Sequence, residues 1–234
     1  NYKMRNKTVV ITGASGKIGS ALLKYFSDQN YNVIGTYNKN KINILKSNIY
    51  IRKVDQSKEV QINNLLKFIK NKKKFNVIGV VNCSVLRPMK KGSKDSFKNW
   101  SRSININANS TYLINKKFCE YFAKRKFGRV INIGSIYSVV GPDFNLYKNE
   151  NFELEPDYMY NKFGMLGLTK YFASKYGKNN VTVNVSVNND GTATTNVSES
   201  STGGMENLGR MVAKAVQDEL VEQKRAGGIL SPYG

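Results

Sequence analysis

Residues 8–23 read T-V-V-I-T-G-A-S-G-K-I-G-S-A-L-L and combine three local patterns. The β-branched run 8–12 predicts a buried strand, glycines follow at positions 13, 16 and 19, and a helical pattern begins at Ala21. Glycine lets the backbone turn tightly and approach a pyrophosphate, because no Cβ stands between them. The following helix directs its N–H groups and its positive dipole end at the phosphates. This order predicts a dinucleotide-binding turn, and a βα turn that needs glycine only for packing is the alternative.

Strand and helix patterns alternate along the rest of the chain. Strands are predicted at 32–37, 49–54, 77–82, 129–134 and 181–187, and helices at 59–70, 100–122 and 156–176. The run 77–82 is apolar, as strands buried on both faces are. The alternation predicts an α/β fold with a doubly wound parallel sheet, a Rossmann-like single domain of three layers.

Length, cysteine content and histidine content limit the classes of function. A chain of 234 residues suits one domain. Its two cysteines, Cys83 and Cys119, lie in separate apolar segments, which indicates a reducing compartment rather than a disulfide framework. Histidine is absent, so Ser-His catalysis is excluded and no metal site is expected. Neither a bilayer-spanning apolar run nor a signal peptide is visible, so a cytoplasmic protein without a membrane partner is predicted.

The net charge of +21 by itself suggests a nucleic-acid partner. Lysine, asparagine, isoleucine and tyrosine are abundant together, however, which indicates biased codon usage rather than a binding patch. The lysines are scattered, and the dense run 72–74 falls at a predicted helix end, where cations complement the helix dipole. A nucleic-acid partner is therefore not expected.

The residues after the second predicted strand bear on the kind of dinucleotide. Many NAD-binding folds place an Asp or Glu there to hold the ribose hydroxyls. Positions 36–39 read T-Y-N-K, without a carboxylate, and Lys17 lies inside the glycine loop. Cations without an acid favour a 2′-phosphate, so NADP(H) is predicted over NAD(H).

Three polar residues in the second half form a candidate catalytic group. Ser135 follows the predicted strand 129–134, at the sheet edge where open α/β sheets bind ligands. Tyr158 and Lys162 are one helical turn apart in the predicted helix 156–176, so they share a face. An ammonium near a phenol stabilises the phenolate, which makes tyrosine usable as an acid. An exposed face of a lysine-rich helix gives the same spacing and is the alternative.

Together these residues resemble the short-chain dehydrogenase/reductase family over roughly residues 6 to 187. The glycine loop is similar to the family's T-G-x-x-x-G-x-G, with Thr12, Gly13 and Gly19 matching. The sequence V-V-N-C-S-V at 80–85 is similar to the family's N-N-A-G strand end, and I-N-A-N at 106–109 resembles the helix that bears its relay asparagine. The family's catalytic serine, tyrosine and lysine correspond to Ser135, Tyr158 and Lys162.

The resemblance implies an NAD(P)-dependent oxidoreductase that acts on a small molecule. It implies that Tyr158 exchanges a proton with the substrate oxygen while hydride moves to or from C4 of the nicotinamide. Lys162 then binds the ribose and stabilises the phenolate, Ser135 orients the carbonyl, Asn107 holds a water, and Asp55 contacts adenine. The implied cofactor-binding residues are Gly13, Ser15, Gly16, Lys17, Ile18, Gly19, Asn38, Lys39, Asp55, Gln56, Asn82, Cys83, Ser84, Tyr158 and Lys162. Family members are commonly dimers or tetramers joined through two long helices, so a homo-oligomer is expected.

A narrower likeness concerns the segment between Ser135 and Tyr158. N-I-G-S-I-Y followed by V-G-P-D-F resembles bacterial oxidoreductases of surface-sugar and flagellin-glycan pathways, which are similar to 3-oxoacyl-carrier-protein reductases. The likeness implies a sugar-derived substrate. Asp143, Asn145 and Tyr147 are either contacts to such a substrate or a surface loop.

The C-terminal part departs from the rest of the chain. Residues 1–190 carry 33 Lys and Arg against 11 Asp and Glu, whereas residues 191–234 carry 4 against 5. We therefore separate a dinucleotide-binding domain at 1–190 from an atypical loop and helix at 191–234, with a linker-like stretch at 192–204 and a helix at 205–224. The family's Pro-Gly after the sixth strand is replaced by Asn188 and Asn189, and its seventh strand is not recognisable. A natural substrate loop and a fused or frameshifted C-terminus are both compatible with this change.

Three hypotheses follow for the function. The first is an NADP(H)-dependent carbonyl reductase or alcohol dehydrogenase. The second is a non-catalytic dinucleotide-binding scaffold, which the altered C-terminal part favours and the Ser-Tyr-Lys group opposes. The third is a sugar-nucleotide epimerase or dehydratase; the spacing of Gly13, Gly16 and Gly19 favours it, and the short chain opposes it because it leaves no room for a second lobe.

Overall fold

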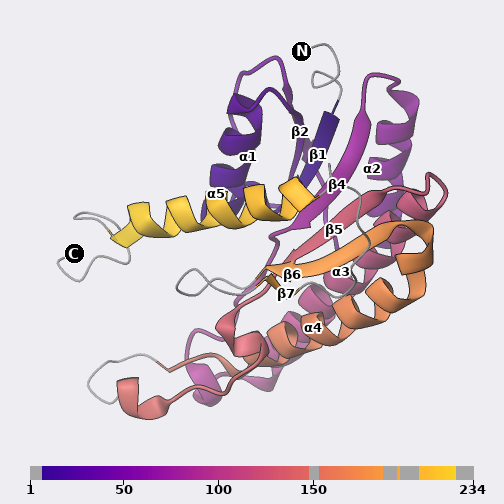
Figure 1. The fold of residues 1–234 in the computed structure, drawn as a ribbon. Coiled ribbons are helices and arrows are strands. Elements are labelled where there is room, and N and C mark those ends of the chain that lie inside the picture. The colour runs from indigo at the N-terminus through magenta and orange to yellow at the C-terminus, as the bar shows by residue number, and fades with distance from the viewer. Residues whose placement is uncertain (1–6, 148–152, 187–193, 196–205, 225–234) are drawn as a thin grey trace.

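The strands of the protein form one sheet in the order β3-β2-β1-β4-β5-β6-β7, as a computed structural model that describes residues 7–147, 153–186, 194–195 and 206–224 shows (Figure 1). The first six strands pair in parallel, and β7 pairs antiparallel with β6. The strands are β1 (Lys7–Thr12), β2 (Asn32–Tyr37), β3 (Ile49–Lys53), β4 (Asn76–Asn82), β5 (Gly128–Ile133), β6 (Val181–Ser186) and β7 (Thr194–Thr195). The predicted doubly wound α/β fold is therefore confirmed.

Helices cover both faces of the sheet and give the three predicted layers (Figure 1). The helices are α1 (Lys17–Asp28), α2 (Glu59–Asn71), α3 (Phe97–Ala123), α4 (Pro156–Tyr176) and α5 (Glu206–Lys224). One buried cluster joins α2, α3 and α4 to strand residues such as Val10, and a second joins α1 and α5 to their neighbours such as Val9. Because the strands are buried on both faces, they read as apolar runs.

Most predicted elements lie within a few residues of their observed bounds. Both ends of β2 and α4 are as predicted. Helix α1 begins at Lys17, so part of the glycine loop is already helical. Helix α3 begins at Phe97 rather than at 100, because the Ser96 side chain accepts a hydrogen bond from the Asn99 N–H (3.3 Å) and caps it.

The C-terminal helix belongs to the packed core. Helix α5 lies against α1 and β6, and Leu208, Val212 and Val216 are buried there. A seventh strand, which the sequence did not reveal, is present as the short β7. The predicted linker 192–204 otherwise lies outside the described residues, and the division at 190 stays a prediction.

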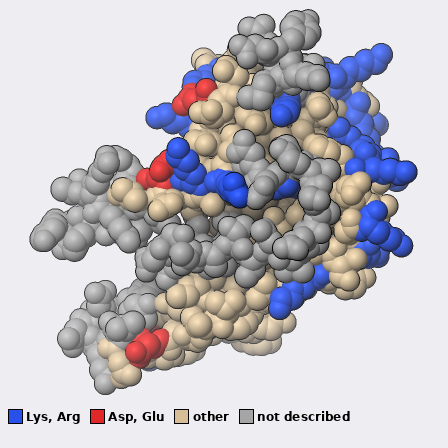
Figure 2. All heavy atoms as spheres, viewed as in Figure 1, with Lys and Arg blue, Asp and Glu red and all other residues tan. Residues whose placement is uncertain are grey.

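Two further findings concern the surface. None of the helices in the described part of the chain is long and apolar enough to cross a bilayer. Figure 2 shows basic side chains spread over the side of the molecule that carries α2, with few acidic side chains on the visible face.

Candidate active site

The carboxyl ends of the parallel strands meet at one edge of the sheet, which we call the carboxyl edge. The predicted cofactor and catalytic residues follow these ends: the glycine loop after β1, Asn38 and Lys39 after β2, Asp55 and Gln56 after β3, Cys83 and Ser84 after β4, and Ser135 after β5. The direction of strand order reverses between β1 and β4. Open α/β sheets bind ligands at such a switch point, so the topology brings the predicted residues to a binding edge.

The glycine loop packs closely against the end of β4. Gly13 has a φ of +61°, and a Cβ built on it would lie 2.8 Å from the Cα of Ser84. A Cβ on Gly19 would lie 2.2 Å from the Gly13 carbonyl oxygen. Gly16 is the N-cap of α1 and has no side chain to cap the first N–H groups of the helix. The loop therefore needs glycine for its shape, and it presents an uncapped helix N-terminus at the carboxyl edge.

The residues after β2 and β3 differ in what they can offer a ligand. Asn38 and Lys39 are exposed. The Asp55 carboxylate already accepts hydrogen bonds from the N–H and hydroxyl of Ser57 (3.0 and 2.7 Å). Gln56 is buried, its amide nitrogen faces the Thr36 hydroxyl at 3.5 Å, and its Oε1 has no partner in the described part of the chain. Gln56 thus has a buried acceptor without a partner among the described residues, whereas Asp55 Oδ1 is already engaged by Ser57.

A neutral hydrogen-bond network crosses the sheet beneath this edge. Thr12 Oγ1 donates to Asn82 Oδ1 (2.9 Å), and Asn82 Nδ2 donates to Asn132 Oδ1 (3.3 Å). Asn132 and Asn115 exchange two hydrogen bonds (3.0 and 3.1 Å), and Asn132 also donates to Thr169 Oγ1 (2.9 Å). These residues are buried and satisfy one another, so the network fixes the ends of β1, β4 and β5 relative to α3 and α4.

Tyr158, Lys162 and Ser135 come together around the end of β5. The Lys162 Nζ donates to the Ile133 carbonyl oxygen (2.5 Å) and lies 5.5 Å from the centroid of the Tyr158 ring. The short helix η2 (Ile136–Ser138) packs against α4, and Ser135 caps η2 by accepting from the Tyr137 N–H (3.3 Å). The predicted face shared by Tyr158 and Lys162 is therefore directed at the end of β5.

Two ionisable groups beside β4 and β5 are strongly perturbed. Burial lowers the pKa of the Lys162 ammonium from 10.5 to about 8, and the nearby Arg87 guanidinium adds a smaller contribution in the same direction. Burial raises the pKa of the Cys83 thiol to about 12. Cys83 is therefore a neutral thiol at neutral pH and not a nucleophile.

The Asn107 side chain connects α3 to the loop that follows β4. Its Nδ2 donates to the Leu86 carbonyl oxygen and its Oδ1 accepts from the Leu86 N–H, both at 2.7 Å. Its Nδ2 also donates to Ser103 Oγ (3.0 Å). The side chain thus fixes the loop between β4 and α3, and a role in holding water stays a prediction.

Sequence reasoning missed a charged cluster next to Tyr158. The Arg87 guanidinium carbon lies 4.7 Å from the centroid of the Tyr158 ring, and its Nη2 forms an ion pair with Glu155 Oε2. Glu155 is buried, and its other oxygen is 3.8 Å from Lys90 Nζ. Because the chain is rich in basic residues, no sequence pattern distinguished Arg87 from the others.

In the segment before α4, the acidic residue Asp143 stabilises a local turn. Asp143 Oδ1 accepts from both the backbone N–H and the side-chain amide of Asn145, each at 2.9 Å. Both residues are exposed at the start of η3 (Phe144–Tyr147). This geometry is that of a surface turn, and contact with a substrate stays a prediction.

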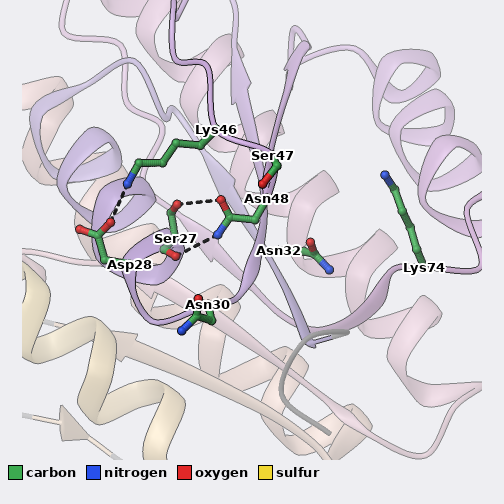
Figure 3. Close-up of a pocket in the computed structure, with 8 residues that line it drawn as sticks. All are labelled: Ser27, Asp28, Asn30, Asn32, Lys46, Ser47, Asn48 and Lys74. Carbon is green, nitrogen blue, oxygen red and sulfur yellow. Dashed lines mark hydrogen bonds and ion pairs between the residues drawn. The ribbon is translucent and has the colours of Figure 1, made fainter. Parts of the chain in front are cut away.

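An open cavity of about 890 Å³ lies at the opposite edge of the sheet, near the amino ends of β2 and β3 (Figure 3). It is lined by Ser27, Asp28, Asn30, Asn32, Lys46, Ser47, Asn48 and Lys74. Asn48 donates to the carbonyl oxygens of Ser27 and Tyr31 (2.9 and 3.0 Å), and Lys46 pairs with Asp28 (2.6 Å). These bonds hold the loops at the amino edge together.

The sequence model of the family described as short chain dehydrogenase matches residues 7–206, most of the chain. The chain therefore belongs to the short chain dehydrogenase family, and it is an oxidoreductase of that family. Among the described residues there is no group of three or more His, Cys, Asp or Glu that could hold a metal ion.

The relatives include proteins of different stated activities. Post-translational flagellin modification protein A of Campylobacter coli is 25% identical, over 77% of this chain and 75% of that protein. The 3-oxoacyl-[acyl-carrier-protein] reductase FabG of Rickettsia typhi is 29% identical, over 76% of this chain and 70% of that protein.

Solved structures share the fold. A short chain dehydrogenase from Leptospira borgpetersenii with bound NAD+ has a TM-score of 0.69 and 22% identity, over 79% of this chain and 72% of that chain. ElxO with NADP bound has a TM-score of 0.66 and 23% identity, over 76% of this chain and 71% of that chain. At these identities the likeness shows the fold alone.

Proposed function

We propose that this protein is an NADP(H)-dependent carbonyl reductase or alcohol dehydrogenase in which Tyr158 is the general acid and base. The observation that carries the proposal is the placement of Tyr158 and Lys162 at the end of β5, on the same sheet edge as the glycine loop. A phenol beside a buried ammonium can give a proton to a carbonyl oxygen or take one from an alcohol.

The carboxyl edge fits a nicotinamide dinucleotide, which supplies or accepts hydride when it is bound. The uncapped N-terminus of α1 would hold the pyrophosphate, with the loop from Gly13 to Gly19 giving it room. The free Oε1 of Gln56 would accept from a donor on the adenosine half. Exposed Lys17 and Lys39, with no carboxylate at the end of β2, support NADP(H) over NAD(H).

The chain's own residues divide the proton chemistry among them. Tyr158 would transfer the proton, and Lys162, anchored on Ile133, would stabilise negative charge on the phenol oxygen and bind the ribose. Ser135 is held by η2 at the same strand end and would orient the substrate oxygen. Asn107 positions the loop that follows β4.

Two of the relatives suggest different substrate classes. The likeness to a flagellin modification protein supports a sugar-derived substrate of a bacterial surface-glycan pathway. The likeness to 3-oxoacyl reductases supports a 3-oxoacyl compound as the alternative.

Two free cysteines support a cytoplasmic site of action.

Self-association is proposed through α3 and α4. Five aromatic side chains on these helices are exposed: Phe97, Tyr112, Tyr160, Phe163 and Tyr171. Such a group of exposed apolar side chains is typical of a protein interface, so a homodimer or tetramer is proposed. Light scattering coupled to size exclusion measures this directly.

Fluorescence titration with NADPH and NADH tests the proposal. We expect both to bind, NADPH more tightly, and we expect the bound NADPH to be oxidised when a carbonyl substrate is added. Absence of binding at millimolar nucleotide would contradict an enzymatic role for this chain. Nucleotide that stays bound through purification would favour the epimerase hypothesis instead.

A further inference from the structure

We propose that Arg87 binds an anionic oxygen group of the substrate, a carboxylate or a phosphate, close to the carbon that is reduced. The inference rests on the proposed function and names the substrate class that its site would select. It is based on the cluster that Arg87, Glu155, Lys90 and Tyr158 form at the carboxyl edge.

Arg87 lies beside the position that a substituent of the substrate would take. Its guanidinium carbon is 4.7 Å from the centroid of the Tyr158 ring. A carbonyl compound that meets the Tyr158 hydroxyl therefore places its neighbouring atoms within reach of the guanidinium. Lys162 approaches the same ring from the end of β5, at 5.5 Å.

The Arg87 guanidinium is held in place by an ion pair, and some of its nitrogens remain available to a ligand. The ion pair with buried Glu155 engages Nη2, while Nη1 and Nε have no hydrogen-bond partner in the described part of the chain. The Arg87 side chain is 36% exposed, so Nη1 can meet a ligand. A buried carboxylate that anchors one nitrogen of an arginine pre-orders the others, which lowers the entropy lost on binding an oxyanion.

The charges around Tyr158 favour a negative ligand. Three cations are present, Arg87, Lys90 and Lys162, against the carboxylate of Glu155. Asp157 adds a second buried carboxylate, on the face of α4 that carries Asn161, which donates to Ser103 of α3. A cationic excess remains on the side of Tyr158, and a neutral substrate would leave it uncompensated.

The test compares three small ketones of similar size with NADPH: acetoacetate, its methyl ester, and 2-oxopropylphosphonate. We expect the wild-type protein to prefer the anions over the ester by about tenfold or more in kcat/KM. Arg87→Gln should remove this preference by raising KM for the anions, with kcat/KM for the ester changed by less than about threefold. The ratio of phosphonate to acetoacetate identifies which anion the site prefers.

Matched variants separate recognition from loss of structure. Arg87→Lys keeps the charge and should retain part of the preference. Lys91→Gln removes an exposed cation from the same loop and should leave the preference unchanged. Because Arg87→Gln leaves Glu155 buried with a weaker partner, Arg87→Gln combined with Glu155→Gln serves if the single variant does not fold.

Calorimetry of acetoacetate and its ester on the complex with NADP+ gives the same comparison without turnover. Tighter binding of acetoacetate that Arg87→Gln abolishes supports the proposal. Equal use or equal binding of acid and ester by the wild type would overturn it, as would an equal loss for all three ketones in Arg87→Gln. Failure of NADPH itself to bind would instead overturn the proposed function, and this inference with it.

Discussion

The two edges of the sheet use polar residues in opposite ways. At the amino edge, several of the side chains that line the cavity in Figure 3 bond one another and the backbone, as Asn48 does with Ser27 and Tyr31. At the carboxyl edge, the N-terminus of α1 has no side-chain cap, and Gln56 and Arg87 keep nitrogen or oxygen atoms without partners in the described chain. Loops must be closed at both edges, yet the buried atoms without a partner among the residues compared, Gln56 Oε1 and Arg87 Nε, lie at the carboxyl edge.

The contrast teaches that unsatisfied polar groups and cavity size can point to different edges of the same sheet. The amino-edge cavity is large and open, but its residues Asn48, Lys46 and Asp28 are occupied in holding the end of α1 to the segment before β3. A buried group without a partner costs free energy, and a ligand that satisfies it recovers that free energy on binding.

The largest difference between the edges is expected for tyrosine hydroxyls. Tyr158→Phe should lower carbonyl reduction by about 10²- to 10⁴-fold, because it removes the proposed proton donor, and should leave NADPH binding nearly unchanged. Tyr50→Phe removes the same atom near the amino edge, where the hydroxyl bonds Ser47 and Lys74, and should leave turnover unchanged. Steady-state kinetics with NADPH measures both, and equal turnover in Tyr158→Phe and wild type would remove the catalytic assignment.

The buried ammonium of Lys162 should make stability depend on pH. Its pKa is lowered from 10.5 in the unfolded chain to about 8 in the folded one. Between these values the unfolded chain binds the proton and the folded chain does not, so the free energy of unfolding rises with pH. The rise, relative to Lys162→Met, should be about 3 kcal/mol in total, and it should be complete above the unfolded pKa.

Urea denaturation of both proteins from pH 7 to 11 measures this difference. Lys170→Met, at an exposed position of the same helix, is the control and should run parallel to the wild type. Parallel curves for Lys162→Met and wild type would show that the Lys162 ammonium is not buried as described.

A smaller effect is expected for the glycine loop. Gly19→Ala places a Cβ against the Gly13 carbonyl oxygen, so the loop must shift, at a loss of about 1–3 kcal/mol in unfolding free energy. The shift should also weaken NADPH binding, because it moves the first turn of α1. At Gly177 a Cβ meets no atom within 4 Å, so Gly177→Ala should lower neither the unfolding free energy nor the affinity for NADPH. Thermal unfolding with and without NADPH distinguishes the two variants.

The smallest effect is expected at the amino edge. Lys46→Met removes the ion pair with Asp28. Both side chains of this pair are about half exposed, and exposed ion pairs contribute little to the free energy of unfolding. The thermal midpoint and NADPH affinity should both stay unchanged within error. A loss of NADPH affinity in this variant would indicate that the amino-edge cavity binds the nucleotide.

Local patterns were sufficient to predict much of the fold and part of the candidate site. The β-branched runs and the proline at the first position of α4 fix elements whose cause lies within a few residues of sequence. The Tyr158–Lys162 spacing likewise depends only on the helical period, so their shared face was predictable.

Contacts between distant segments were not predictable in the same way. Arg87 and Glu155 are 68 residues apart and meet only because β4 and α4 bring their loops together. The two hydrogen bonds of Asn107 to Leu86 depend on the path of that loop. The burial of Val212 depends on α5 reaching α1, which its amphipathic pattern allows but does not specify.

The most direct measurement is a crystal structure of the protein grown with NADPH. We expect the nucleotide at the carboxyl edge, with its pyrophosphate at the N-terminus of α1 and its nicotinamide ribose beside Tyr158 and Lys162. Nucleotide in the amino-edge cavity around Asn48, or Tyr158 and Lys162 directed away from the bound nucleotide, would contradict this assignment.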